Sequence, residues 1–89
     1  MINKYKNETG IDIRAKAILA EVVEAYLNNG QPVSSKIISE KLNTLLSSSS
    51  IRLVMSKLEE QGYLYAPHTS AGRMPTDRGL KLFVDGLLA

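Results

Sequence analysis

PHTSAGRMPT (residues 67–76) is a turn-rich segment that contains no acidic residue. Residues 63–66 before it, Tyr-Leu-Tyr-Ala, have strand character, and Thr76 at its end is a good N-cap for a helix. Gly72 can adopt a positive φ, which favours a β-hairpin with its tip at residues 70–73. The segment therefore predicts a hairpin that carries Arg73 at its tip and is followed directly by a helix.

The segment before this hairpin has the pattern of an amphipathic helix with a serine-rich start. Residues 47–50 are all serine, a good N-cap residue, and Gly62 can end the helix. At about 100° per residue, one face, which we expect to be buried, carries Ile51, Val54, Met55 and Leu58. The opposite face carries Ser49, Leu53, Ser56 and Glu60, with Arg52 and Lys57 on the flanks. The serine run is too short, and too closely flanked by apolar residues, for a low-complexity linker.

Three further helices follow from the same periodicity. The first starts after Asp12, a candidate N-cap, and ends at Gly30; its apolar stripe is Ala15, Ile18, Leu19, Val22, Val23, Tyr26 and Leu27. The second is about two turns long and is capped by Ser34 or Ser35; its buried positions are Ile37, Ile38 and Leu42. The last starts after Thr76 and is expected to bury Leu80, Phe83, Val84 and Leu87.

Together these elements predict a mainly α domain with one small β-hairpin. Residues 43–46 form a tight turn between the second and third helices, which is the minimal helix-turn-helix pattern. The hairpin adds a wing, so the expected fold is a winged helix-turn-helix. A chain of 89 residues makes one small domain. We expect a flexible N-terminal arm at residues 1–10 and the domain at residues 11–89.

Composition narrows the function classes. With no cysteine, a disulfide framework and a thiolate zinc site are excluded. Residues 1–10 lack the apolar core of a signal peptide, and no apolar run approaches the roughly 18–20 residues of a membrane span. We therefore expect a cytoplasmic protein with no membrane partner.

Nothing in the sequence supports an enzyme. It offers no paired carboxylates, no nucleophile next to a base and no glycine loop that could cradle a phosphate. His68 is the single histidine and makes a poor metal ligand or catalytic base, and Ser70 has no nucleophile context. No cofactor or metal is expected.

The charged residues are segregated although the net charge is only +2. No acidic residue lies between Glu40 and Glu59, whereas Lys41, Arg52 and Lys57 do. Such segregation suits one surface that faces an anion, although ordinary scatter in a small chain is the alternative.

A DNA duplex is the anion that this arrangement fits best. We expect the third helix to enter the major groove with its N-terminal turn facing the base edges. Arg52 can bind a guanine or a phosphate, and Leu53 can contact a thymine methyl group or remain covered or exposed for other reasons. Arg73 can reach the minor groove or its phosphates, or can be a solvated turn residue. His68 can order the base of the wing or touch a phosphate.

The candidate DNA-binding residues come from the second helix, the third helix and the wing. They are Ser35, Lys36, Ser47, Ser48, Ser49, Ser50, Arg52, Leu53, Ser56, Lys57, His68, Thr69, Ser70 and Arg73.

The chain resembles the N-terminal DNA-binding domain of the HrcA family, the bacterial heat-inducible transcription repressors. The matching positions, spread over residues 11–88, are Gly30-Gln31-Pro32-Val33-Ser34-Ser35, Ser47, Ile51-Arg52, Met55, Leu58-Glu59, Gly62, residues 67–76, Gly79 and Phe83-Val84-Asp85. The resemblance implies a repressor of chaperone operons that binds an inverted-repeat operator as a homodimer. It also implies that the chaperonin GroEL keeps the repressor active.

The chain departs from the family pattern in the third helix and in length. Leu53 and Val54 stand where the family usually has an asparagine and an acidic residue. Ser49 and Ser50 likewise stand where the family usually has alanine and threonine. The turn before this helix lacks the usual glycine. Family members continue into a larger dimerisation and sensing region, so we expect a fragment of a longer repressor whose last helix is partly exposed and prone to self-association.

A second function class fits the same fold. A winged-helix domain can bind a protein instead of DNA, and here Leu53 and the last helix would form the contact. Salt-sensitive binding to an operator duplex separates the two hypotheses, because only phosphate contacts release counterions from DNA.

Overall fold

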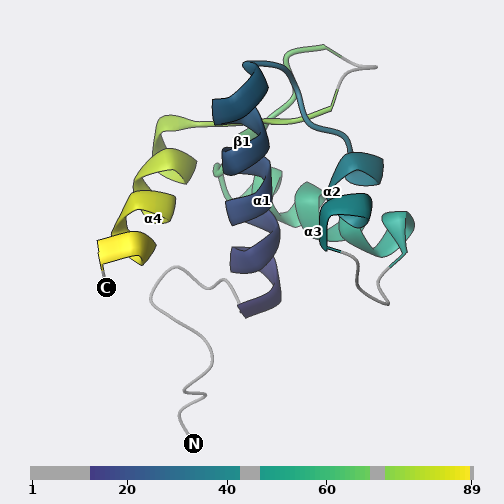
Figure 1. Cartoon of the computed structure of the whole chain (residues 1–89), viewed down its shortest axis with the longest axis horizontal. Coiled ribbons are helices and arrows are strands. Elements are labelled where there is room, and N and C mark those ends of the chain that lie inside the picture. Colours follow the sequence, from purple (N-terminus) through teal and green to yellow (C-terminus); the bar gives the residue numbers. More distant parts are fainter. Residues whose placement is uncertain (1–12, 43–46, 69–71, 89) are drawn as a thin grey trace, which may run out of the picture.

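The structure is a computed structural model that describes residues 13–42, 47–68 and 72–88, without the side chains of residues 87 and 88. Its elements are α1 (Ile13–Asn29), α2 (Ser35–Leu42), α3 (Ser48–Glu60), β1 (Leu64–Tyr65), β2 (Met74–Pro75) and α4 (Asp77–Leu88). In Figure 1, α1 runs through the middle, with α2 and α3 on one side and α4 on the other. The predicted fold class, mainly α with a small hairpin, is confirmed.

The expected hairpin is present, and several other expected segments lie outside the described residues. β1 and β2 pair antiparallel, Leu64 opposite Pro75 and Tyr65 opposite Met74. The strand is therefore shorter than the expected residues 63–66, and Tyr63, directly before it, is part of the core. The expected arm at residues 1–10, Asp12 and the turn at residues 43–46 lie outside the described residues, and the division into arm and domain stays a prediction.

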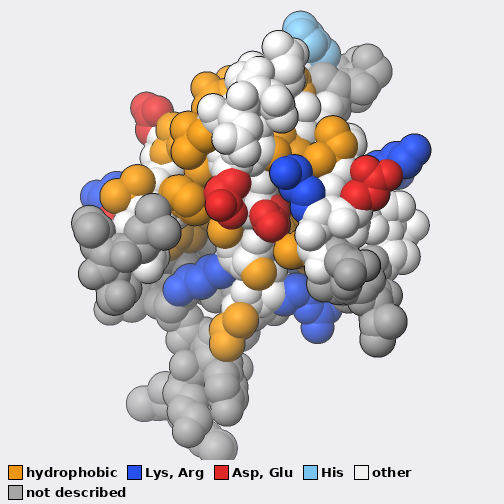
Figure 2. Space-filling model, viewed as in Figure 1, with side chains coloured by type: hydrophobic (Ala, Val, Ile, Leu, Met, Phe, Trp, Pro, Cys, Tyr) orange, Lys and Arg blue, Asp and Glu red, His pale blue; other side chains and the backbone are white. Residues whose placement is uncertain are grey.

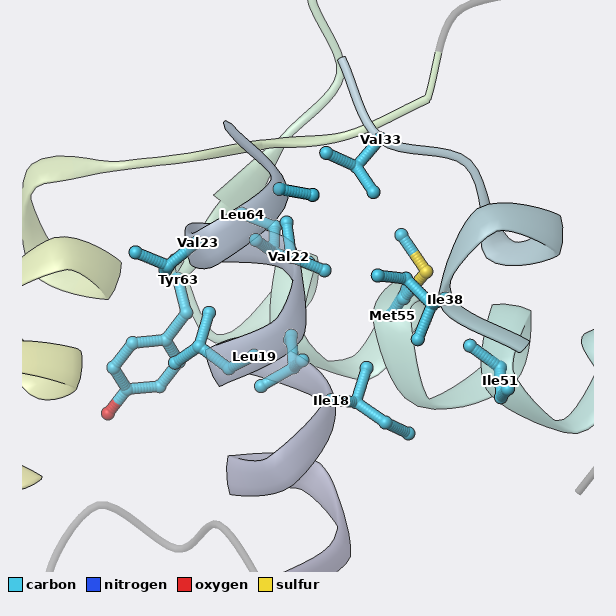
Figure 3. Close-up of a cluster of buried hydrophobic side chains, with 12 residues drawn as sticks. Ile18, Leu19, Val22, Val23, Val33, Ile38, Ile51, Met55, Tyr63 and Leu64 are labelled. Atoms are coloured by element: carbon cyan, nitrogen blue, oxygen red, sulfur yellow. The ribbon is translucent and has the colours of Figure 1, made fainter. Parts of the chain in front are cut away.

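The hydrophobic core lies where α1 meets α3. Ile18 and Val22 of α1 and Ile51 and Leu58 of α3 have no solvent-exposed surface, and Ile38 of α2 closes the same cluster (Figure 3). The other buried apolar residues are Leu19, Val23, Ala25, Val33, Met55, Tyr63 and Leu64. Burying a side chain of this size stabilises the fold by about 1.5–3 kcal/mol. Because α3 supplies part of the core, its opposite face is held outward.

Most predicted core positions are buried or half-buried, three are exposed, and the side chain of Leu87 lies outside the described residues. Leu27 was expected in the stripe of α1, but its side chain is 63% exposed. At 100° per residue it lies about 140° from Val22, which puts it off the buried face, while Ala25 lies within that face. Ile37 of α2 and Val84 of α4 are exposed as well. α2 is short, and α4 packs mainly on α1 and β2.

The predicted helix ends are confirmed where the structure describes them. Gly30 (φ 67°) and Gly62 (φ 85°) adopt the left-handed conformation after α1 and α3. The Thr76 hydroxyl accepts a hydrogen bond from the Gly79 N–H at 3.1 Å, as an N-cap of α4 does, and donates one to the Gly62 carbonyl oxygen at 2.6 Å. The end of α3 is thus tied to the start of α4.

Tyr63 fixes the hairpin against α4. Its backbone carbonyl accepts from the Thr76 N–H at 3.1 Å, and its hydroxyl accepts from Nη2 of Arg78 at 3.1 Å. The Arg78 guanidinium also stacks over the Tyr63 ring, 4.6 Å from its centroid. A Cβ at Gly79 would lie 2.2 Å from the Tyr63 carbonyl oxygen, so the close approach of α4 requires a glycine there.

No helix in the described part of the chain combines the length and the apolar character that crossing a membrane requires.

Two leucines of α3 test the orientation of this helix. We expect Leu58→Ala to lower the free energy of unfolding by about 2–5 kcal/mol, because it leaves a cavity in the core. Leu53→Ala, the same change on the exposed face, should cost less than about 0.5 kcal/mol. Urea denaturation followed by circular dichroism measures both, and equal losses for the two variants would contradict the orientation of α3.

Candidate nucleic-acid interface

The N-terminal turn of α3 is exposed and capped by Ser47. The Ser47 hydroxyl accepts a hydrogen bond from the Ser50 N–H at 3.2 Å and donates one to the Ser50 hydroxyl at 3.2 Å. Ser48 and Ser49 are exposed beside it, and the first turn contains no acidic residue. The positive end of a helix dipole surrounded by small hydroxyl groups can approach a phosphate or a base edge closely.

The outward face of α3 carries the side chains that the helical periodicity assigned to it. Arg52 and Lys57 are exposed, Ser56 is half-buried, and Leu53 is 59% exposed. Two cations and an apolar side chain are thus available on the surface of one helix. Such a face can bind phosphates and contact a thymine methyl group, but whether any of these residues binds DNA stays a prediction.

α2 adds two lysines next to this helix, Lys36 and Lys41, of which Lys36 is a candidate DNA-binding residue. Ser34, one of the two candidate caps, is the N-cap, since its hydroxyl accepts from the Ile37 N–H at 3.2 Å. Ser35 is the first residue of the helix and is half-buried, and Lys36 is exposed. Because α2 packs directly against α3, Lys36 belongs to the same half of the molecule as Arg52 and Lys57.

The base of the wing differs from the prediction. Gly72 does not adopt a positive φ; a Cβ there would lie only 2.3 Å from the Val33 carbonyl oxygen. Gly72 is therefore needed for a close approach of two backbones rather than for a turn. His68 is exposed, at the edge of the face that Figure 2 shows. Thr69 and Ser70 lie outside the described residues.

Arg73 is at the base of the wing and not at its tip, so its predicted position is wrong. Its backbone forms an isolated antiparallel bridge with Val33, and its Nε donates to Oε1 of Glu59 at 2.7 Å. The guanidinium also donates to the Gly72 carbonyl oxygen at 3.4 Å. Nε and Nη1 of the guanidinium that was expected to reach DNA are thus hydrogen-bonded within the domain.

Glu59 and Val33 are the residues of this region that the sequence analysis missed. Glu59 comes four residues after buried Met55, about 40° from it on the helical wheel, so it borders the core face rather than the outer face. That position was the available indication that its carboxylate would meet a partner from another element. Nothing in the sequence indicated the bridge from Val33.

A hollow of about 440 Å³ lies between α1 and α4, away from the face just described. Its lining residues are Lys16, Leu19, Ala20, Leu82, Phe83, Asp85 and Gly86. α1 separates it from α2 and α3 in Figure 1, and Figure 2 shows hydrophobic side chains gathered on the α4 side of the molecule. Within the described ranges no group of three or more histidine, aspartate or glutamate residues is arranged to hold a metal ion.

A helix-turn-helix whose second helix is followed by a packed hairpin defines a winged-helix domain. Over residues 16–83 the chain matches the family described as the ribonuclease R winged-helix domain, and it belongs to that family.

Named proteins similar to the chain include transcription repressors. The chain is 56% identical over 80 residues to the heat-inducible transcription repressor HrcA of Erythrobacter litoralis, a match that covers 90% of the chain and 23% of the relative. The corresponding protein of Sphingopyxis alaskensis is 54% identical over the same shares of both chains. These matches confirm the resemblance to HrcA, and the chain spans about a quarter of the length of these relatives.

A solved structure supports the fold independently. A crystal structure described as that of a hypothetical protein superposes with a TM-score of 0.83 at 45% sequence identity. The superposition covers 88% of this chain and 25% of the other. The winged-helix arrangement is therefore shared with an experimentally determined relative.

The serine cap of α3 gives a local stability prediction. Ser47→Ala removes the acceptor for the Ser50 N–H and should lower the free energy of unfolding by about 0.5–2 kcal/mol. Ser48→Ala, one residue later on the exposed first turn, should change it by less than about 0.5 kcal/mol. Thermal unfolding of the two variants measures the difference. A larger loss of stability in Ser48→Ala than in Ser47→Ala would contradict the assignment of Ser47 as the N-cap.

Proposed function

We propose that the chain is the sequence-specific DNA-binding module of a transcriptional repressor of chaperone operons. The observation that carries the proposal is the outward face of α3, an exposed serine-capped helix start followed by Arg52, Leu53 and Lys57. Its similarity to proteins named heat-inducible transcription repressor supports the same function. Binding is non-catalytic and uses no cofactor.

The proposed mechanism is occlusion of a promoter. α3 lies in the major groove with its first turn toward the base edges, and the wing grips the neighbouring backbone. Arg52 forms a bidentate contact to a guanine, and Leu53 packs against a thymine methyl group. Lys36 and Lys57 bind phosphates and give the complex its salt dependence. His68, Thr69 and Ser70 belong to the proposed wing contact, whereas Arg73 is already engaged by Glu59.

The assembled repressor is proposed to act as a homodimer on an inverted repeat. A single domain covers one half-site, and a second copy on the other half-site raises the affinity by making the second contact intramolecular. The dependence on GroEL and a cytoplasmic location follow from the resemblance to HrcA and are part of the same proposal.

The decisive experiment is a titration of the 89-residue chain with an inverted-repeat duplex from upstream of a chaperone operon. We expect a mobility shift that weakens as salt rises, with a slope of about −0.9 in log K against log salt for each phosphate contact. A scrambled duplex of the same length is the control. Absence of a salt-sensitive shift at low salt and high protein would overturn the DNA proposal and favour a protein-binding module that uses Leu53.

Arg52→Ala tests the contact to a base. It should weaken operator binding by about 1–3 kcal/mol and flatten the preference for the operator over the scrambled duplex, because a bidentate guanine contact is lost. Lys81→Ala, which removes a cation from α4 on the other side of α1, should leave that preference unchanged. Equal weakening of Arg52→Ala on both duplexes would assign Arg52 to a phosphate instead.

A further inference from the structure

We propose that Arg73 and Glu59 form a strut that fixes the wing relative to α3. Arg73 is then a positioning residue for DNA binding and not a phosphate contact. The part of this inference that concerns DNA depends on the proposed function, whereas the part that concerns the wing does not.

The ion pair joins two elements that both face the proposed duplex. Nε of Arg73 lies 2.7 Å from Oε1 of Glu59, and the two side chains are only 27% and 37% exposed. A charged hydrogen bond of this length is among the stronger ones, and its partial burial limits screening by salt. The wing base and the last turn of α3 are thus held together by a specific contact.

The position of Glu59 on α3 is itself unfavourable without a partner. Glu59 is in the last turn of the helix, where the helix dipole presents its negative end. Arg73 supplies a cation from another element, which offsets this unfavourable interaction.

The backbone of Arg73 fixes a third segment. The Val33 N–H donates to the Arg73 carbonyl oxygen and the Arg73 N–H donates to the Val33 carbonyl oxygen, each at 2.9 Å. Val33 is buried between α1 and α2. One residue therefore connects the α1–α2 linker through its backbone and α3 through its side chain.

At Gly72 the wing strand and the α1–α2 linker are in close backbone contact. A Cβ at Gly72 would lie 2.3 Å from the Val33 carbonyl oxygen and 2.8 Å from the Ser34 nitrogen. The incoming wing strand is thus pressed against the linker at the residue before Arg73. The path of the wing strand at its base is therefore determined by its contact with the α1–α2 linker and, through Arg73, with α3.

The hairpin alone is too short to hold the wing. Each strand has two residues, and an isolated two-stranded hairpin is at best marginally stable in water. A wing that must contact DNA together with α3 benefits from a fixed base, because ordering it on binding would cost affinity. In the proposed complex Nε of Arg73 stays on Glu59, so the side chain keeps the base of the wing in place while other residues contact the phosphates.

The test compares Glu59→Gln, Arg73→Gln and the double variant of the 89-residue chain on the operator duplex. We expect each single variant to bind roughly three- to tenfold more weakly, about the net contribution of one hydrogen bond, and the double variant to be no weaker than either. The slope of log K against log salt should stay unchanged. Glu59→Gln is the sharper variant, since removing a negative charge should by electrostatics alone strengthen DNA binding.

Glu60→Gln is the matched control, with the same change of charge on the exposed neighbour of Glu59. It should leave operator binding equal or slightly tighter. A slope lowered by about 0.9 in Arg73→Gln, with binding undiminished in Glu59→Gln, would make Arg73 a phosphate contact and overturn the proposal.

Amide hydrogen exchange gives a measurement that needs no DNA. In Glu59→Gln the Val33 and Arg73 amides should exchange faster, while the Leu58 amide in α3 keeps its protection. Unchanged exchange at Val33 and Arg73 would overturn the strut. If the wild-type chain binds no duplex, the proposed function fails, and the exchange rates still decide whether Glu59 fixes the wing.

Discussion

The packing of α1 against α3 is the constraint on which the rest of the structure depends. Ile18 and Val22 on one helix and Ile51 and Leu58 on the other are completely buried, so neither helix can rotate about its axis without opening the core. This contact fixes which residues of α3 face outward. The chemistry proposed for the DNA-facing side therefore follows from apolar side chains on the other side of the same helix.

The fold could be predicted from the sequence because its determinants are local. Periodicity identified the buried faces of α1 and α3, and the caps at Ser47 and Thr76 depend on residues within one turn. The error at Leu27 has a physical cause. This residue is apolar, but its angle on the wheel of α1 puts its side chain where no neighbouring element covers it. Periodicity shows which face is apolar, but only the arrangement of the elements shows how wide the covered face is.

The candidate site could be predicted only in part. The outward position of Arg52 and Leu53 follows from the helical wheel. The environment of Arg73 does not, because its partners are 14 and 40 positions away in sequence, at Glu59 and Val33. Gly72 was correctly singled out for the wrong reason, since a glycine required by a positive φ and one required by a neighbouring backbone look identical in sequence.

The contacts of Tyr63 give α4 a mechanical role. Tyr63 stands between the end of α3 and the first wing strand, and it holds Thr76 through its backbone and Arg78 through its ring and hydroxyl. Among the side chains of α4 that the structure describes, no large one is fully buried, and Leu80, Leu82 and Phe83 pack half-buried against the core. A shift of α4 would consequently act both on the core and, through Tyr63, on the root of the wing, which couples the position of this helix to that of the wing.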